Sequence, residues 1–259
     1  MNKDLEEKYL SVIEDNVNVG NSNAVVEFFI LIAGIVGIFV LLYIFADSIG
    51  CFFIDRMSNK TQMQIENAFS FMINKNMYET TSNTKQLETI RDKIIPLDKR
   101  LQGKSKFPIY EISGKEINAF VLPNGTIFFT QGLLKEVKDE EILTFVLAHE
   151  LGHYAHRDHL KSISRQIIIG FITSIFMSQN NNINLTIESI ADLNGLSYSR
   201  KQELEADLFA NKIVYKLYGN NDGAVEFFQM LKEKEKFPEF LQYFSTHPST
   251  QKRLDAIKN

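Results

Sequence analysis

A chain of 259 residues that is 44% hydrophobic and 23% charged has enough material for one sizeable folded domain with appendages. Its net charge of -4, with no pattern of basic residues interleaved with aromatic ones, excludes nucleic acid as an expected partner. The single cysteine, Cys51, excludes an intramolecular disulfide.

The N-terminal region combines a polar tail with a long apolar segment. Residues 1–27 are polar and mostly acidic, whereas residues 28–46 contain no charged side chain. A helix of this length rises far enough to cross the hydrocarbon layer of a bilayer, at about 1.5 Å per residue. A buried core helix is the alternative, but such helices are rarely apolar on all sides for five turns. We therefore predict one transmembrane helix over 28–46, which makes the membrane a partner of the chain.

The next segment, residues 47–104, reads as a helical connector. Apolar residues recur at helical spacing in 65–72 and again in 87–94, separated by a polar stretch near residues 79–84. Pro96 is expected to stop the second helix. We expect this connector to pack on the following domain and to carry no chemistry.

Residues 105–259 predict a folded domain of the α+β class that is mostly helical. Expected strands cover 108–112, 117–122 and 126–130. Asn124-Gly125 predicts a tight turn between the last two strands, and hence a small antiparallel hairpin or sheet. The second hairpin strand, 126–130, is the expected edge strand along which an extended peptide would lie.

Helices dominate the remainder of this domain. The predicted helices cover 139–156, with Asp139 as N-cap, and 199–219, where Ser199 and Gln202 form a capping box and Gly219 ends the helix. Shorter helical segments are centred on Phe228 and on Leu254. Residues 167–177 predict a core helix or one lying on the membrane surface, and residues 179–184 predict a loop.

The motif His149-Glu150-Leu151-Gly152-His153 lies on the first of these helices. Residues four apart share one face of an α-helix, so His149 and His153 can direct two imidazoles at one point. Zn²⁺ accepts neutral imidazole nitrogen, and Glu150 is placed to take a proton from an attacking water. The preceding turns are apolar, so this helix is buried, and a buried imidazole pair needs a partner. Gly152 is useful where another part of the chain must approach closely.

Two residues compete for the role of third metal ligand. His159 follows His149 by ten residues, which is the spacing of metzincins, but His156 stands where that family needs a glycine. Glu203 lies on the later helix among apolar neighbours and would complete a site of two histidines and one glutamate. We favour Glu203 and expect one zinc ion per chain. Residues 156–159 are otherwise interpreted as a solvated polar helix end.

Asp207 follows Glu203 by one helical turn and therefore shares its face. From this position its carboxylate can accept the Nδ1–H of a ligand histidine and thereby fix the tautomer of that histidine.

Three of these features together resemble a known peptidase family: HELGH at 149–153, Glu203 followed four residues later by Asp207, and THPST at 246–250. The family includes the HtpX heat-shock protease, the CaaX prenyl endopeptidases and the periplasmic protease BepA. The likeness covers about residues 105–259. It implies a zincin-like fold, protein or peptide substrates, and peptide hydrolysis with Glu150 as general base and His149, His153 and Glu203 as zinc ligands.

His247 is open to three interpretations. The resemblance implies a histidine that approaches the zinc and restrains activity, whereas its chemistry alone permits a hydrogen bond to the oxyanion of the reaction, a catalytic role. The simplest alternative is a cap for the helix that Pro248 begins.

The resemblance also bears on location and role. By analogy with relatives that have a single anchor, we expect a bacterial inner-membrane protein with a periplasmic catalytic domain that acts in membrane or envelope protein quality control. Basic residues on the two sides of the span are nearly balanced, so they do not decide the orientation. The alternatives are a latent protease, shut by His247 or by the loop near 180–184, and a zinc-dependent binding or chaperone-like module without catalysis. The sequence gives no indication of an oligomeric state.

Overall fold

The computed structural model describes residues 3–7, 23–68, 78–103, 105–177, 198–234, 236–247 and 251–258. The chain divides into two compact units, Met1–Phe45 and Ala46–Asn259. The predicted loop at 179–184 and the residues Pro248 to Thr250 lie outside the described ranges.

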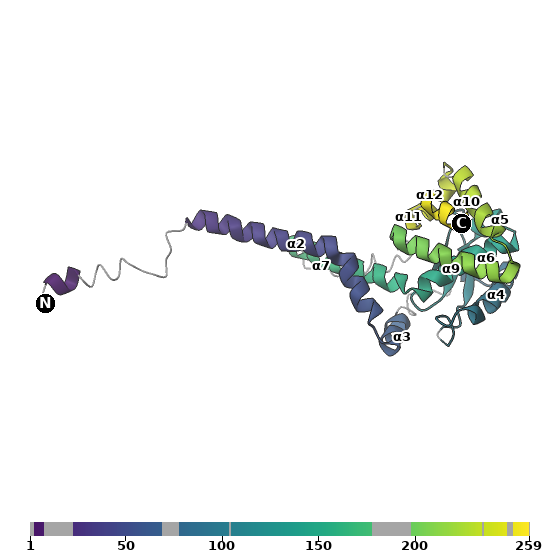
Figure 1. The fold of residues 1–259 in the computed structure, drawn as a ribbon, viewed down its shortest axis with the longest axis horizontal. Helices are drawn as coiled ribbons and strands as arrows, with labels where there is room; N and C mark the ends of the chain where they lie inside the picture. The colour runs from purple at the N-terminus through teal and green to yellow at the C-terminus, as the bar shows by residue number, and fades with distance from the viewer. Residues whose placement is uncertain are drawn as a thin grey trace. The chain divides into compact units, whose positions relative to one another are not determined.

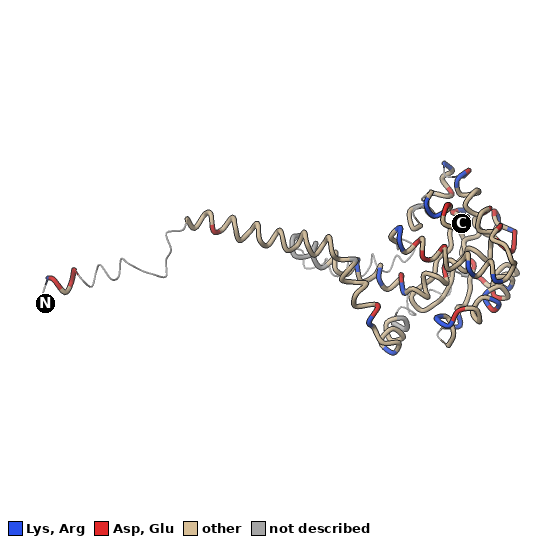
Figure 2. The backbone as a smooth tube through the Cα atoms, in the orientation of Figure 1, with Lys and Arg blue, Asp and Glu red and all other residues tan. Residues whose placement is uncertain are grey.

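Helix α2 spans Ala24–Asp55 and contains the predicted apolar segment (Figure 1). Its large apolar side chains are exposed on all sides, as at Phe29 (63% exposed), Leu31 (62%) and Ile44 (62%). Figure 2 shows no charged residue along this segment between Glu27 and Asp47. The prediction of one long apolar N-terminal helix is confirmed, and its part Ala24–Ala46 is long and apolar enough to cross a membrane.

The two helices predicted after this segment are present as α3 (Asn59–Ala68) and α4 (Ser82–Ile94). Thr81 and Thr84 form a capping box at the start of α4. Pro96 lies in a short 3₁₀ helix, Ile95–Leu97, that ends α4. The buried face of α4 packs against helix α6 of the same unit.

The sheet has four short strands in the order β1-β2-β4-β3. They are β1 (Tyr78–Glu79), β2 (Ile109–Ile112), β3 (Ala119–Val121) and β4 (Ile127–Thr130). The predicted antiparallel hairpin is present as β3 and β4, but β2 pairs with β4 in parallel, so the sheet is mixed rather than antiparallel throughout. Strand β4 lies between β3 and β2, antiparallel to β3 and parallel to β2.

The hairpin turn holds three residues instead of the expected two. The amide of Gly125 donates to Leu122 O (2.9 Å), and the amide of Leu122 donates to Thr126 O (2.8 Å). Gly125 has φ +82°, the left-handed conformation that a three-residue hairpin loop requires at its last position.

The expectation that 126–130 forms an edge strand is wrong. Strand β4 has partners on both sides, β2 and β3, so its backbone groups are already used within the sheet. The edge of the sheet next to α6 is β3, which contacts that helix directly.

The described helices that follow the sheet in the chain lie in the Ala46–Asn259 unit (Figure 1). They are α5 (Gln131–Glu136), α6 (Glu140–Ala155), α7 (Asp158–Met177), α9 (Arg200–Tyr218), α10 (Asp222–Lys234), α11 (Pro238–Thr246) and α12 (Gln251–Lys258). The predicted caps of α6 at Asp139 and of α9 at Ser199, Gln202 and Gly219 are confirmed. The stretch predicted at 167–177 is the second half of α7, which begins at Asp158.

Helices α6 and α9 pack closely along their length, and Gly152 makes this possible. A Cβ atom at Gly152 would lie 3.1 Å from the ring of Phe209 and 3.2 Å from the Cα atom of Ala206. The close approach expected at Gly152 is therefore confirmed, and it brings the functional faces of α6 and α9 together.

Candidate metal centre

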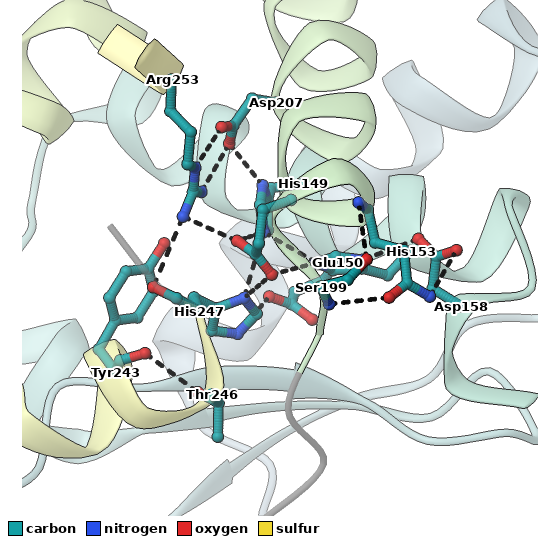
Figure 3. Close-up of polar contacts among 12 residues, drawn as sticks. His149, Glu150, His153, Asp158, Ser199, Asp207, Tyr243, Thr246, His247 and Arg253 are labelled. Carbon is teal, nitrogen blue, oxygen red and sulfur yellow. Dashed lines mark hydrogen bonds and ion pairs between the residues drawn. The ribbon is translucent and has the colours of Figure 1, made fainter. Parts of the chain in front are cut away.

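Helix α6 places two imidazoles one turn apart in the interior of the domain (Figure 3). His149 and His153 are 2% and 0% exposed, and their Nε2 atoms lie 3.1 Å apart. The apolar run before the motif buries α6, so both rings point into the contact with α9 rather than into solvent.

Two other elements bring further donor atoms to the same point. Glu203, in the first turn of α9, has Oε1 3.3 Å from His153 Nε2 and Oε2 3.6 Å from His149 Nε2. His247, directly after α11, has Nδ1 3.0 Å from Glu203 Oε1 and 3.3 Å from His149 Nε2. Donor atoms of these four buried residues all lie within 4.8 Å of one another. His247 is the C-cap residue of α11. The alternative that His247 caps a helix beginning at Pro248 falls on a residue outside the described ranges.

The charge balance of this cluster fits a bound cation. Four carboxylates around it, those of Glu150, Asp158, Glu203 and Asp207, are at most 1% exposed. Two cationic side chains face them: Arg253 (1% exposed) pairs with Glu203 and Asp207, and Lys161 lies 3.7 Å from Asp158. An excess of buried negative charge is unfavourable unless a cation compensates it. A divalent metal ion held by His149, His153, Glu203 and His247 would supply that charge.

The ionisation of the donors differs between the two histidines: His149 is neutral, whereas His153 has to release a proton to bind a metal. Burial lowers the pKa of His149 to about 4, so its imidazole is neutral, as a metal ligand must be. Burial also opposes charging of His153, but Asp158 and Glu203 outweigh it and raise the pKa to about 10. Burial would raise the pKa of Glu203, yet His247 and His153 hold it well below its usual value.

Asp207 and Arg253 position the first histidine and the glutamate. Asp207 Oδ1 lies 2.9 Å from His149 Nδ1, the atom that faces away from the donor cluster. Arg253, on α12, donates from Nη2 to Asp207 Oδ1 (2.9 Å) and pairs through Nη1 with Glu203 Oε2 (2.8 Å). The structure thus places Asp207 where the sequence predicted it, and it adds Arg253, which was not predicted.

Asp158 plays the corresponding part for the second histidine, and the expectation that this segment is solvated is wrong. Its Oδ2 atom lies 3.0 Å from His153 Nδ1, and the residue is 0% exposed. Arg157, with φ +59°, turns the chain sharply after α6, so α7 begins at Asp158 and folds this carboxylate back onto α6. Little in the sequence indicates that Asp158 is buried, because the polar residues 156–159 resemble a solvated helix end.

His159 does not join the donor cluster among the described residues. It is 0% exposed and stacks on the ring of Tyr154, with ring centroids 5.2 Å apart.

Another residue that the sequence did not point to is Tyr198, whose ring stacks on that of His153 with ring centroids 3.8 Å apart. Tyr198 precedes the cap of α9, and its amide donates to Thr246 O (3.2 Å), which ties the start of α9 to the segment that carries His247.

Glu150 lies beside the donors but makes no side-chain hydrogen bond to a described residue. Its Oε1 atom is 3.7 Å from His247 Nε2, and neither carboxylate oxygen has a hydrogen-bond partner among the described residues, although the backbone amide of Val121 in β3 is near enough to lower the pKa. Burial raises the pKa of this carboxyl, whereas His247 and His153 act in the opposite direction. A carboxylate with a raised pKa next to a cluster of metal-donor residues is suited to proton transfer near neutral pH.

Comparison with known proteins agrees with this donor set. Residues 81–259 match the sequence pattern of peptidase family M48. The chain belongs to peptidase family M48. This membership implies a divalent metal and confirms the resemblance to the family of HtpX and BepA.

Relatives from several sources carry protease names. The mitochondrial metalloendopeptidase OMA1 of Bos taurus is 29% identical over 170 residues, covering 58% of this chain and 31% of that protein. The protease HtpX of Legionella pneumophila, strain Philadelphia 1, is 30% identical over 198 residues, covering 58% and 69%. The beta-barrel assembly-enhancing protease of Yersinia pestis is 25% identical over 173 residues, covering 60% and 35%. The chain spans about a third to a half of the length of the OMA1 proteins that it matches.

Proposed function

We propose that this M48 family member is a membrane-anchored, zinc-dependent endopeptidase. The observation that carries the proposal is the convergence of His149, His153, Glu203 and His247 on one point, with the carboxylate of Glu150 beside it. Two histidines and a glutamate form a common catalytic zinc site.

The spacing of the donors fits zinc, and their chemistry favours zinc over calcium and magnesium. Zinc–ligand distances of about 2.0 to 2.2 Å in a tetrahedron separate neighbouring ligand atoms by roughly 3.3 to 3.6 Å. Five pairs of donor atoms lie 3.0 to 3.6 Å apart, and the donor atoms of all four residues lie within 4.8 Å of one another. Calcium and magnesium prefer six or more oxygen ligands, whereas this cluster offers mostly imidazole nitrogen.

In the proposed reaction Glu150 moves the proton. When bound, the metal supplies Lewis-acid polarisation of the scissile carbonyl. The Glu150 carboxylate accepts a proton from the attacking water and delivers it to the leaving amine as the peptide C–N bond breaks, and its raised pKa makes it a stronger base for the first transfer. Asp207 and Asp158 hold the rings of His149 and His153 in place through their Nδ1 atoms.

Strand β3 is the proposed binding edge for the substrate backbone. The amide of Leu122 donates to Thr126 O, and the amide of Thr130 donates to Asn118 O, so the even-numbered residues of β3 face β4. By the alternation of antiparallel strands, the backbone groups of Ala119 and Val121 face away from β4. The Val121 amide lies near the Glu150 carboxylate, so a peptide added along this edge would place a bond next to the proposed base.

The test compares wild type with Glu150→Gln, a substitution that preserves shape and removes the base. We expect Glu150→Gln to retain zinc and to lose casein cleavage by about 100- to 10,000-fold, the usual contribution of a general base. Chelation of the metal should abolish wild-type cleavage. Equal cleavage by Glu150→Gln would exclude Glu150 as the base, and zinc without any wild-type cleavage would favour a binding module or a latent enzyme.

A second candidate state is latency, favoured by the position of His247. Its Nδ1 atom occupies a fourth donor position, which a catalytic zinc site normally leaves to water or substrate. If His247 restrains the site, His247→Ala will raise casein cleavage at unchanged protein concentration. If His247 instead stabilises the oxyanion, the same substitution will lower cleavage.

The proposed setting is a bacterial inner membrane with the catalytic domain in the periplasm, where the enzyme would remove misfolded or misassembled proteins. The apolar part of α2 and the relatives named HtpX and beta-barrel assembly-enhancing protease support this setting. A reporter that is active only in the periplasm, fused to the C-terminus, tests this orientation. An inactive reporter would mean that the catalytic domain lies on the cytoplasmic side.

A further inference from the structure

A cavity of about 400 Å³ lies in the Ala46–Asn259 unit where the segment before β3, helix α5, the end of α10 and the start of α11 meet (Figure 1). This volume lies within the range of about 300 to 1,000 Å³ that is common for ligand sites. The buried side chains of its lining are apolar, as at Ile117 (4% exposed) and Phe240 (3%), whereas charged ones such as Glu239 are exposed. The cavity therefore has an apolar floor and a charged rim, and none of the metal-donor residues lines it.

The start of α11 closes one end of the free edge of β3. The amide of Ile117 donates to the carbonyl of Glu239 (2.8 Å), while the carbonyl of Asn118 accepts from β4. Because successive residues of a strand face opposite sides, the Ile117 amide points away from β4, as do the backbone groups of Ala119 and Val121. A peptide paired with Ala119 and Val121 therefore meets α11 at Ile117, where the backbone donor is already used.

The cavity lies at a defined distance from the proposed cleavage point. The Val121 amide lies near the Glu150 carboxylate, and Ile117 precedes Val121 by four residues. At about 3.3 Å per residue, the two positions are roughly 13 Å apart along the strand. Antiparallel pairing, the commoner arrangement in sheets, places the substrate residue that reaches Ile117 about four residues C-terminal to the cleaved bond.

The pairing also sets the direction of that residue's side chain. Side chains directly opposite each other on paired strands point to the same face of a sheet, and the side chain of Ile117 lines the cavity. The substrate side chain at this position therefore points toward the cavity. Because the backbone donor of Ile117 is used by α11, burial of the substrate side chain against Ile117, Phe237 and Phe240 is the contact that remains there.

We propose that this cavity is a substrate subsite that takes one large apolar side chain, about four residues C-terminal to the cleaved bond. The free edge of β3 leads to the cavity, and its apolar floor selects an apolar side chain. The inference rests on the proposed function, because the β3 edge is the substrate-binding edge proposed there.

Phe237 offers a substitution that spares the core, since its side chain lines the cavity and is 55% exposed. Tyr215, which is 61% exposed on α9 and outside the cavity, is the matched control. Fluorescence anisotropy would measure the affinity of labelled β-casein, an unfolded protein, for the full chain in phosphatidylcholine nanodiscs. All chains would carry Glu150→Gln, which keeps the bound protein uncut. We expect Phe237→Ala to weaken casein binding several-fold and Tyr215→Ala to leave it unchanged.

Cleavage by chains with an intact Glu150 locates the contact on the substrate. Mass spectrometry of the casein fragments should show large apolar residues enriched at about the fourth residue after the cleaved bond, and Phe237→Ala should lose this preference. Synthetic peptides that end two residues after that bond cannot reach the cavity, so Phe237→Ala should cut them at the wild-type rate. Slower cutting of these short peptides would indicate a structural role for Phe237 and overturn the proposal.

The two measurements separate the subsite from the proposed function. Weaker casein binding by Phe237→Ala, without cleavage by any chain, would support the subsite and refute the peptidase. Cleavage by wild type, with equal casein binding and an unchanged preference in Phe237→Ala, would refute the subsite alone. A preference at another distance from the cleaved bond would overturn the assignment to this cavity.

Discussion

At the scale of single residues, Asp158 holds the imidazole of His153 from inside the protein. Both groups are fully buried, and the 3.0 Å contact fixes the ring so that Nε2 faces the other donors. Carboxylates that orient a ligand histidine in this way commonly contribute a factor of about 10 to 100 to metal affinity.

We therefore expect Asp158→Ala to weaken zinc binding by about 10- to 100-fold, and Asp158→Asn to weaken it less, because an amide oxygen still accepts the Nδ1–H. Competition with a fluorescent chelator measures the affinity. Asp92→Asn, at a side chain that is 66% exposed, is the control and should leave affinity unchanged. Wild-type affinity in Asp158→Ala would show that the contact has no role in metal binding.

The sequence predicted the donors but not all the residues that hold them. His149, His153 and Glu203 follow from helical spacing and ligand chemistry, and the structure brings them together with His247. Asp158 was missed because a reversal of the chain, which only the three-dimensional structure reveals, carries it back to His153. Arg253 was missed because one charged residue on a short helix gives no sign of a partner on α9; its position four residues before the buried Ile257 was the available hint.

At the scale of elements, helix α4 supports the helix that carries the metal-binding motif. Its buried residues Leu87, Ile90 and Ile94 belong to the same core as Phe145 and Leu151 of α6. The family match also begins at residue 81, just before α4. The helix predicted as a connector thus contributes to the core of the catalytic unit.

Truncation of a side chain in this contact should destabilise the whole unit. Ile90→Ala removes a side chain that is 1% exposed, and we expect a loss of about 2 to 5 kcal/mol in the free energy of unfolding. Gln86→Ala, on the exposed face of the same helix, should change it by less than about 0.5 kcal/mol. Denaturant unfolding measures both, and equal stability of the two variants would mean that α4 does not share the core.

Element type was predictable where the pattern was long, and strand pairing was not. The caps of α6 and α9 identify both helices. Whether β4 lies at an edge depends on β2, which is distant in the chain, and β1 has only two residues, Tyr78 and Glu79, too few to give a periodic signal.

At the scale of the whole molecule, the exposed apolar helix separates this chain from an ordinary compact enzyme. Most of the large apolar side chains of α2 between Val25 and Phe45 are exposed in the structure, and a protein in water would not leave such a surface uncovered. The helix favours membrane anchoring.

Charges placed in the middle of this helix should release the protein from the membrane. An Asp at the centre of a span costs about 2.5 to 3.5 kcal/mol in membrane insertion, so Ile35→Asp with Ile38→Asp should move the full chain from the carbonate-resistant fraction to the soluble or aggregated fraction. The matched change of both residues to Leu should leave it in the membrane. If the doubly charged variant stays carbonate-resistant, α2 is not the anchor.

The most direct test of the central claim is the zinc content of the purified full chain, measured by mass spectrometry for wild type, Glu203→Ala and Glu205→Ala. Glu205 lies on the same helix but outside the donor cluster, so it controls for loss of a carboxylate from α9. We predict about one zinc per chain in wild type and in Glu205→Ala, and loss of zinc in Glu203→Ala, because its carboxylate contributes to the cluster. Full zinc in Glu203→Ala, or none in wild type, would contradict a site built from His149, His153 and Glu203.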